Sequence, residues 1–146
     1  MNNIIKSCKT CYLAVCDEGK PYVVPMNFAL SDDFIILHSG KSGRLWEILQ
    51  KNKAVCINWT VGEKLTWQDI QVGCSYRVES CSVNVEGLLE IIDDYDEKYT
   101  LLQKFMSQYS NIEFKFSVPA VKNVAVFKVP IGQITGRMFG VRPPYN

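Results

Sequence analysis

Short hydrophobic runs alternate with polar turns through the N-terminal part of the chain. The apolar run at residues 12–16 is followed by a turn at 17–20 and by residues 21–30, which are rich in amino acids that favour β-strands. A second turn, 31–33, leads into the apolar run 34–37. Because connections this short join antiparallel strands, the pattern predicts a three-stranded meander.

Two prolines lie in the second of these predicted strands. Pro21 and Pro25 have no N–H to donate to a neighbouring strand. We therefore expect this strand to lie at a sheet edge or to be interrupted near Pro25. An interruption would leave backbone groups free for a ligand.

Helical periodicity is present at two places. Residues 43–51 put Leu45, Ile48 and Leu49 on one face, and the segment ends in cations that suit the negative end of a helix. A second helix is predicted to begin with Asp94 as an acidic N-cap. Its apolar face repeats at helical spacing through Tyr95, Tyr99, Leu102 and Met106.

The other apolar segments predict further strands. They are residues 54–61, residues 75–92 as a long strand or as a strand with a bulge near Gly87, and two strands at 124–129 and 131–137. Residues 62–73 carry no assignable pattern and are interpreted as a possible lid. Strands with two helices inserted among them favour a mainly β, α+β fold: a single domain over 1–146, built as a split antiparallel barrel of roughly six strands.

Composition narrows the choice of partners. The chain has 146 residues, of which 47% are hydrophobic and 21% are charged, with a net charge of +1. This suits one globular domain, and without a long basic run neither nucleic acid nor an anionic membrane is expected as a partner. The chain has no apolar stretch long enough to span a bilayer and no signal-peptide core at its start, so we expect a cytoplasmic protein.

Six cysteines do not form a recognisable framework. Cys8 and Cys11 make a single C-x-x-C pair without a matching second pair, and His38 is the only histidine. We expect no metal, and no disulfides in a cytoplasmic chain of this size. Cys16 and Cys56 lie in apolar runs and are interpreted as small core residues.

The segment 38–44 reads His-Ser-Gly-Lys-Ser-Gly-Arg and lies between a predicted strand and a predicted helix. Free backbone N–H groups and fixed positive charge at a helix start suit a phosphate. A nucleotide-triphosphate loop is excluded because Ile35 stands where that motif needs a glycine. A site for a single phosphate group needs fewer residues than a nucleotide-triphosphate loop. The alternative is a plain strand-to-helix connection with Ser42 as N-cap and solvated cations.

The segments 11–15, 19–28 and 37–44 together resemble the pyridoxamine 5′-phosphate oxidase-like split barrels, particularly the nitroimidazole-resistance branch. The resemblance implies a flavin mononucleotide (FMN) bound at the interface of a homodimer. Val24, Met26 and Asn27 would contact the polar edge of the flavin ring. The ribityl phosphate would be surrounded by His38, Ser39, Lys41, Ser42, Gly43 and Arg44.

The function implied is an FMN-dependent oxidoreductase that reduces a small organic acceptor, of which a nitro-aromatic compound is one example. His38 is the candidate catalytic residue, as acid, base or phosphate donor, and the alternative is a structural histidine. Vitamin B6 oxidation is not expected, because the additional basic residues of the core oxidases cannot be located. Two other functions stay open: a non-catalytic flavin carrier or sensor, and a barrel that binds haem through His38 or another ligand.

Several further residues have two interpretations each. Trp59, Trp67 and Tyr76 would border a flavin or belong to the core or a dimer interface. Arg137 would bind a phosphate or carboxylate, including one across a dimer, or would be a solvated cation at a strand end.

Overall fold

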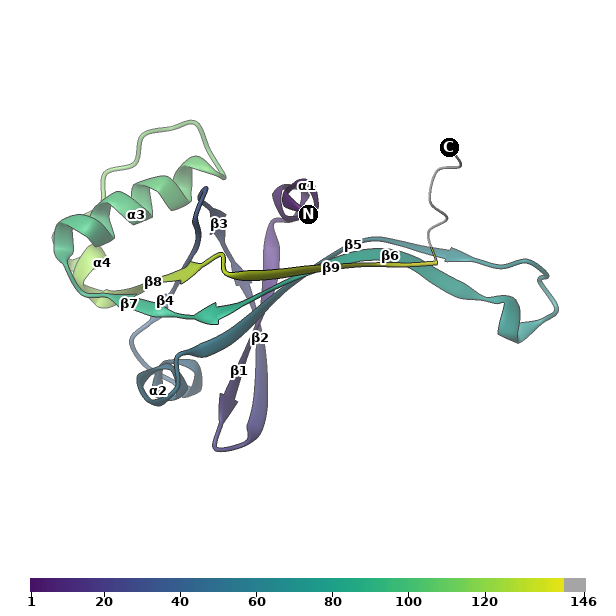
Figure 1. Ribbon diagram of the computed structural model, residues 1–146. Coiled ribbons are helices and arrows are strands. Elements are labelled where there is room, and N and C mark those ends of the chain that lie inside the picture. The colour runs from purple at the N-terminus through teal and green to yellow at the C-terminus, as the bar shows by residue number, and fades with distance from the viewer. Residues whose placement is uncertain (141–146) are drawn as a thin grey trace.

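The computed structural model, which describes residues 1–140, is built around nine strands in two antiparallel sheets (Figure 1). The strands are β1 (Thr10–Asp17), β2 (Lys20–Asn27), β3 (Ala29–Leu30), β4 (Phe34–Gly40), β5 (Ala54–Thr66), β6 (Arg77–Leu88), β7 (Glu90–Ile92), β8 (Val124–Pro130) and β9 (Gln133–Phe139). The helices are α1 (Asn2–Ser7), α2 (Arg44–Lys51), α3 (Tyr95–Ser107) and α4 (Val118–Asn123), with a 3₁₀ turn, η1, at Gly73–Ser75.

The two sheets close on each other as a split barrel. One has the strand order β2-β1-β5-β6-β9 and the other β3-β4-β8-β7. The chain passes from the first sheet to the second at Leu89, between β6 and β7, where the Leu89 N–H donates to the Lys53 carbonyl at 2.8 Å. The predicted mainly β, α+β split barrel is confirmed, with more strands and two more helices than the sequence pattern indicates.

The main core fills the barrel and follows the alternation of the strands. Leu13, Ile57 and Val85 are fully buried, while their neighbours in sequence face outward. Trp59 is also fully buried, and its ring meets that of Phe28 edge to face with centroids 5.2 Å apart. Trp59 is therefore a core residue, which decides between its two interpretations.

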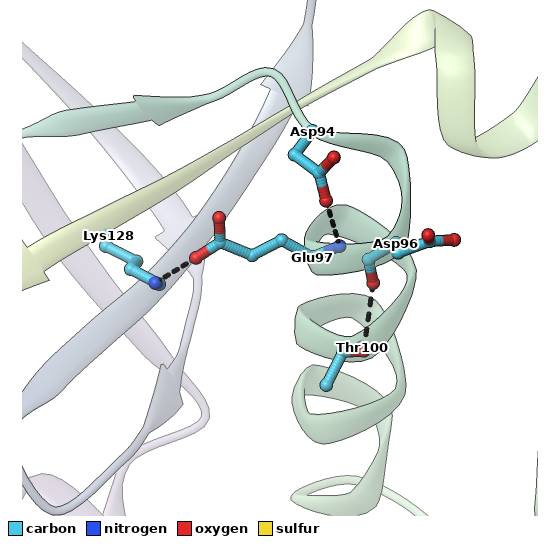
Figure 2. Close-up of polar contacts among 5 residues, drawn as sticks. All are labelled: Asp94, Asp96, Glu97, Thr100 and Lys128. Carbon is cyan, nitrogen blue, oxygen red and sulfur yellow. Dashed lines mark hydrogen bonds and ion pairs between the residues drawn. The ribbon is translucent and has the colours of Figure 1, made fainter.

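A second core lies between the outer face of β4 and β8 and the helix α3. Figure 2 shows how the start of this helix is fixed: the Asp94 carboxylate accepts from the Glu97 N–H at 2.8 Å, and the Glu97 side chain pairs with Lys128 of β8. The predicted acidic cap is thus confirmed. The most buried face of the helix is shifted from the predicted one, and carries Lys98, Leu101, Leu102 and Phe105.

Strand β2 lies at an edge of its sheet, as the prolines predict, but it is not interrupted. Pro25 lies opposite Tyr12 in an unbroken register with β1. An edge strand tolerates a missing N–H when that position faces away from its only neighbour. Of the two alternatives for this strand, the edge position is confirmed and the structure shows no interruption near Pro25.

Of the two alternatives for the segment around Gly87, the structure has the long strand, since β6 runs from Arg77 to Leu88 and its register with β5 shifts between Val61 and Lys64 rather than at Gly87. Gly87 serves a different purpose. A Cβ atom there would come within 3.1 Å of the Pro130 carbonyl oxygen, so the glycine permits a close approach of two strands.

Residues 62–73 do not form a lid. They belong to a hairpin in which β5 runs out to Thr66 and β6 returns from Arg77, and this hairpin projects from the barrel on the side away from α3 and α4 (Figure 1). We call residues 62–78 the arm. Trp67 and Tyr76 stack on each other within it, with ring centroids 5.4 Å apart.

Candidate functional site

The loop between β4 and α2 ends in a backbone conformation that favours glycine. Gly43 has φ 87° and ψ 175° and is the N-cap of α2, and its carbonyl accepts from the Glu47 N–H at 3.1 Å. No side chain caps this helix, so the alternative interpretation with Ser42 as N-cap is wrong. The first N–H groups of α2 are left free for another acceptor.

The two cations of this loop lie on exposed positions and point in different directions. The Arg44 guanidinium lies over the Tyr22 ring of β2, with its carbon 4.3 Å from the ring centroid. The Lys41 ammonium is directed toward α3, near enough to Lys98 to help lower the pKa of that lysine. Positive charge therefore flanks the free N–H groups on two sides.

A groove of about 370 Å³ opens beside this loop, between β2 and β4. Five of its lining residues are ones that the sequence interpretation names: Val24, Met26, Asn27, His38 and Ser39. The other four predicted residues, Lys41, Ser42, Gly43 and Arg44, lie outside this lining, on the loop that continues from Ser39 into α2.

The sequence interpretation missed three residues of the lining. They are Thr10, Pro25 and Leu45. Leu45 follows the loop directly, and Pro25 lies between two predicted residues. The order of the chain alone could therefore have placed both of them at the groove. Thr10 could not be placed in this way, because only the pairing of Thr10 with Asn27 in the β1–β2 register brings it to the groove.

The floor of the groove is fixed by the end of α3. The Asn27 amide donates to the Lys9 carbonyl at 3.2 Å. Beyond Asn27, the Phe28 N–H donates to the Tyr109 hydroxyl at 3.0 Å, and the Gln108 side chain donates to the Phe28 carbonyl at 2.8 Å. These bonds hold the chain where β2 turns toward β3, and so set the positions of Met26 and Asn27.

His38 is half-buried and separates the groove from a second cavity. Its ring meets that of Phe105 edge to face, with centroids 4.7 Å apart and planes at 74°. Burial lowers the pKa of His38 from its usual 6.5, so the imidazole is neutral at physiological pH. A neutral imidazole offers one donor and one acceptor.

The second cavity, of about 230 Å³, lies between His38 and the helices α3 and α4. Ligand pockets for drug-sized molecules measure about 300–1,000 Å³. A haem macrocycle therefore does not fit this cavity as it stands.

The C-x-x-C pair of Cys8 and Cys11 does not form a reactive site. Burial raises the pKa of Cys11 to about 12 and also raises the pKa of Cys8, so neither thiol of the C-x-x-C pair ionises readily. Within residues 1–140, no three His, Cys, Asp or Glu side chains come together as a metal site.

Arg137 lies on the outer face of the larger sheet. It borders a polar groove of about 370 Å³ together with Asn58, Thr60, Ser80, Ser82 and Phe139. This face is distant in sequence from the 38–44 loop and does not share lining residues with the groove at β2.

A sequence model of the family described as pyridoxamine 5′-phosphate oxidase matches residues 2–138. The chain belongs to this family. The resemblance of the segments around 11–44 is thereby confirmed.

Solved structures similar to this member of the oxidase family include a candidate 5-nitroimidazole antibiotic resistance protein from Bacteroides thetaiotaomicron. The two sequences are 43% identical, the match covers 92% of this chain and 80% of that one, and the TM-score is 0.82. This likeness supports the nitroimidazole-resistance branch in particular.

Two more distant structures share the fold. The flavocytochrome Anf3 from Azotobacter vinelandii is 19% identical over 99% of this chain and 68% of its own, with a TM-score of 0.83. An FAD-binding protein from Mesorhizobium loti is 20% identical over 95% of this chain and 92% of its own, with a TM-score of 0.68. No curated protein matches the sequence. Among the helices in residues 1–140, none is both long and apolar enough to cross a membrane.

Proposed function

We propose that this protein is an FMN-dependent oxidoreductase that passes electrons to a small organic acceptor. The observation that carries the proposal is the groove between β2 and β4, which adjoins an uncapped helix start flanked by Lys41 and Arg44. An elongated ligand with a flat ring at one end and a phosphate at the other suits these two neighbouring environments.

The phosphate end of the ligand would lie at the 40–44 loop. Free N–H groups at the start of α2 and the partial positive charge of the helix dipole favour an anion there. Lys41, Ser42 and Arg44 would add charge-assisted and hydroxyl hydrogen bonds. Gly43 lets the backbone follow this path without a side chain in the way.

The ring end would lie along β2. On an edge strand, alternate residues direct their N–H and C=O groups away from the sheet, and a flavin ring has polar atoms along one edge that pair with such groups. Val24 and Met26 supply apolar contact, and the Asn27 amide supplies a polar one. The FAD-binding protein and the flavocytochrome with the same fold support a flavin as the ligand class.

A bound flavin supplies the redox chemistry. The residues of the chain would bind and orient it, and His38 is the candidate for holding or moving a proton, because a neutral imidazole at the wall of the groove is able to do either. The similarity to a candidate 5-nitroimidazole resistance protein supports nitro-aromatic compounds as acceptors.

The flavin would be shared at a homodimer interface. The arm supports this part of the proposal, because it carries exposed apolar side chains that no other part of residues 1–140 covers. They include Leu65, Trp67, Ile70, Val72, Tyr76 and Val78. Apolar surface of this extent on a projecting hairpin is typical of a contact with another chain.

The experiment that tests the proposal is to load the purified protein with excess FMN, remove the free ligand, record the visible spectrum and identify the retained cofactor by mass. We expect retained FMN near one per chain with a shifted absorption band. A folded protein that retains no flavin would overturn the proposal. FMN that is retained but is not turned over with any pair of donor and nitro-aromatic acceptor would favour the carrier or sensor function instead.

A further inference from the structure

A lysine without a counter-ion is buried in the first turns of α3. Lys98 is only 3% exposed. Its ammonium donates to the Val124 carbonyl at 2.5 Å, which is its one acceptor among the hydrogen bonds of residues 1–140. In the same part of the chain, no carboxylate lies within ion-pair distance of it. An ammonium has three donors and a full charge, so a single carbonyl compensates its burial poorly.

The acidic residues at the start of α3 serve other groups. The Asp94 carboxylate accepts from the Glu97 N–H, and the Glu97 side chain pairs with Lys128 of β8. Figure 2 shows the Asp96 carboxylate on the opposite side of the helix from Lys128, pointing away from the sheet. The helix that carries Lys98 therefore does not supply its counter-ion.

The buried ammonium lies at the loop between β4 and α2. Val124, whose carbonyl it contacts, is paired with Gly40 in the register of β4 and β8, and Gly40 is the last residue of β4. Burial lowers the pKa of Lys98, the charge of the nearby Lys41 ammonium lowers it further, and Asp93, the weakest influence, acts in the opposite direction. Two ammonium groups thus come together beside this loop.

Two like charges in a partly buried place repel each other more strongly than they would in water, because the dielectric constant is lower there. An anion that accepts hydrogen bonds from both ammonium groups removes this cost. A phosphate monoester suits the position, since it carries up to about two negative charges at neutral pH and has three acceptor oxygens. The free N–H groups at the start of α2 favour the same ligand.

We propose that Lys98 is a third cationic ligand of the flavin phosphate, which it binds together with Lys41 from the α3 side of the loop. Arg44 lies on the other side, over the Tyr22 ring of β2. The proposal rests on the proposed function for the identity of the ligand as FMN. It adds a binding residue from a helix that is distant in sequence from the 38–44 loop.

The test compares the full-length wild type with Lys98→Gln, which removes the charge but keeps a donor for the Val124 carbonyl. We expect the affinity for FMN to fall at least about tenfold, because charge-assisted hydrogen bonds to the phosphate are lost. Riboflavin has no phosphate, so its affinity should stay the same. Fluorescence titration measures both. Lys122→Gln, at an exposed position of the neighbouring α4, is the matched control and should leave both affinities unchanged.

Thermal unfolding of the flavin-free protein separates phosphate binding from a structural role. Inorganic phosphate should raise the unfolding midpoint of the wild type, and should raise that of Lys98→Gln clearly less. If Lys98 only tied α3 to β8, the substitution would lower the midpoint without phosphate and leave the phosphate-dependent rise unchanged. Lys98→Met, which suits the apolar face of the helix, is the second variant if Lys98→Gln does not fold.

The outcomes distinguish this proposal from the flavin function. An unchanged ratio of FMN to riboflavin affinity in a folded Lys98 variant would overturn the role of Lys98 and leave flavin binding intact. A wild type that retains no FMN would overturn the flavin function. The phosphate-dependent rise would then decide alone: a rise that depends on Lys98 would support the anion site, and no rise or an equal rise in both proteins would overturn it.

Discussion

The His38 and Phe105 rings meet edge to face, with centroids 4.7 Å apart, and this contact joins β4 to the last turn of α3. It buries an imidazole in a place where a positive charge is disfavoured. The same histidine forms a wall of two cavities, so its protonation state affects both.

Protonation of His38 should destabilise the fold. Burial lowers its folded-state pKa below 6.5, so the unfolded chain binds the proton more tightly, and the His38 contribution to stability is complete above pH 6.5 and is lost as the pH falls through the folded-state pKa. We expect the free energy of unfolding to fall from pH 7.5 to 5, by about 1.4 kcal/mol for each unit of pKa displacement.

Denaturant unfolding at several pH values measures this dependence. His38→Phe is the matched variant, because it keeps an aromatic ring against Phe105 and cannot titrate. Its stability should fall less over the same range. Identical pH profiles for the wild type and His38→Phe would show that the imidazole is not responsible.

The two loop cations should distinguish FMN from riboflavin. Lys41→Ala combined with Arg44→Ala should weaken FMN binding at least about tenfold, because hydrogen bonds to charged groups contribute about 1.5–3 kcal/mol each and exposure reduces that value. Riboflavin has no phosphate, so its affinity should be nearly unchanged. Fluorescence titration measures both, and equal losses for the two ligands would contradict a phosphate site at this loop.

Gly43 should not tolerate a side chain. Its φ of 87° with ψ of 175° is a conformation that residues with a Cβ rarely adopt, so Gly43→Ala should cost about 1–3 kcal/mol in stability or distort the loop and weaken FMN binding. Gly40→Ala is the control from the same segment. Gly40 has no positive φ, and nothing lies within 4 Å of the position that a Cβ atom would take there, so this change should be nearly neutral. Similar effects from both substitutions in thermal unfolding would contradict the strain argument.

The arm should determine the oligomeric state. We expect a dimer in light scattering of the FMN-loaded protein, and Trp67→Ser combined with Ile70→Ser should shift it toward the monomer by removing large apolar surface. Leu88→Ser is the control, because Leu88 is 69% exposed but lies at the barrel end of β6. A monomeric wild-type protein would rule out the shared-interface arrangement.

The sequence indicates the strands of the barrel well because short apolar runs alternate with polar turns along the chain. Leu13 and Ile57 lie in two of these runs, and the alternation of side chains along a strand places both inside the barrel. The arm lacks this signal, since a hairpin without a core beneath it has no buried face to mark in sequence. The helix α1 is short and buries only Ile5, so its position depends on packing against the barrel rather than on a local pattern.

The site residues that could be predicted are those that lie close together in the sequence, on strands that the sequence itself indicates. Residues 24–27 and 38–39 lie on two strands whose identity the sequence indicates, and they line one groove. The burial of Lys98 was not predicted, because this lysine lies on a helical face that also carries Leu102 and Phe105. Only the docking of α3 against β8 brings it beside Val124 and near Lys41.

The groove takes one wall from each sheet, β2 from the larger and β4 from the smaller. Its width is therefore set by how tightly the barrel is closed, and the contact at Gly87 and Pro130 is one of the points of closure. A residue that contacts no ligand is therefore able to change which ligands bind, because it widens or narrows the whole groove. Ligand selectivity in such a barrel depends on the contacts between its two sheets as much as on the residues that line the groove.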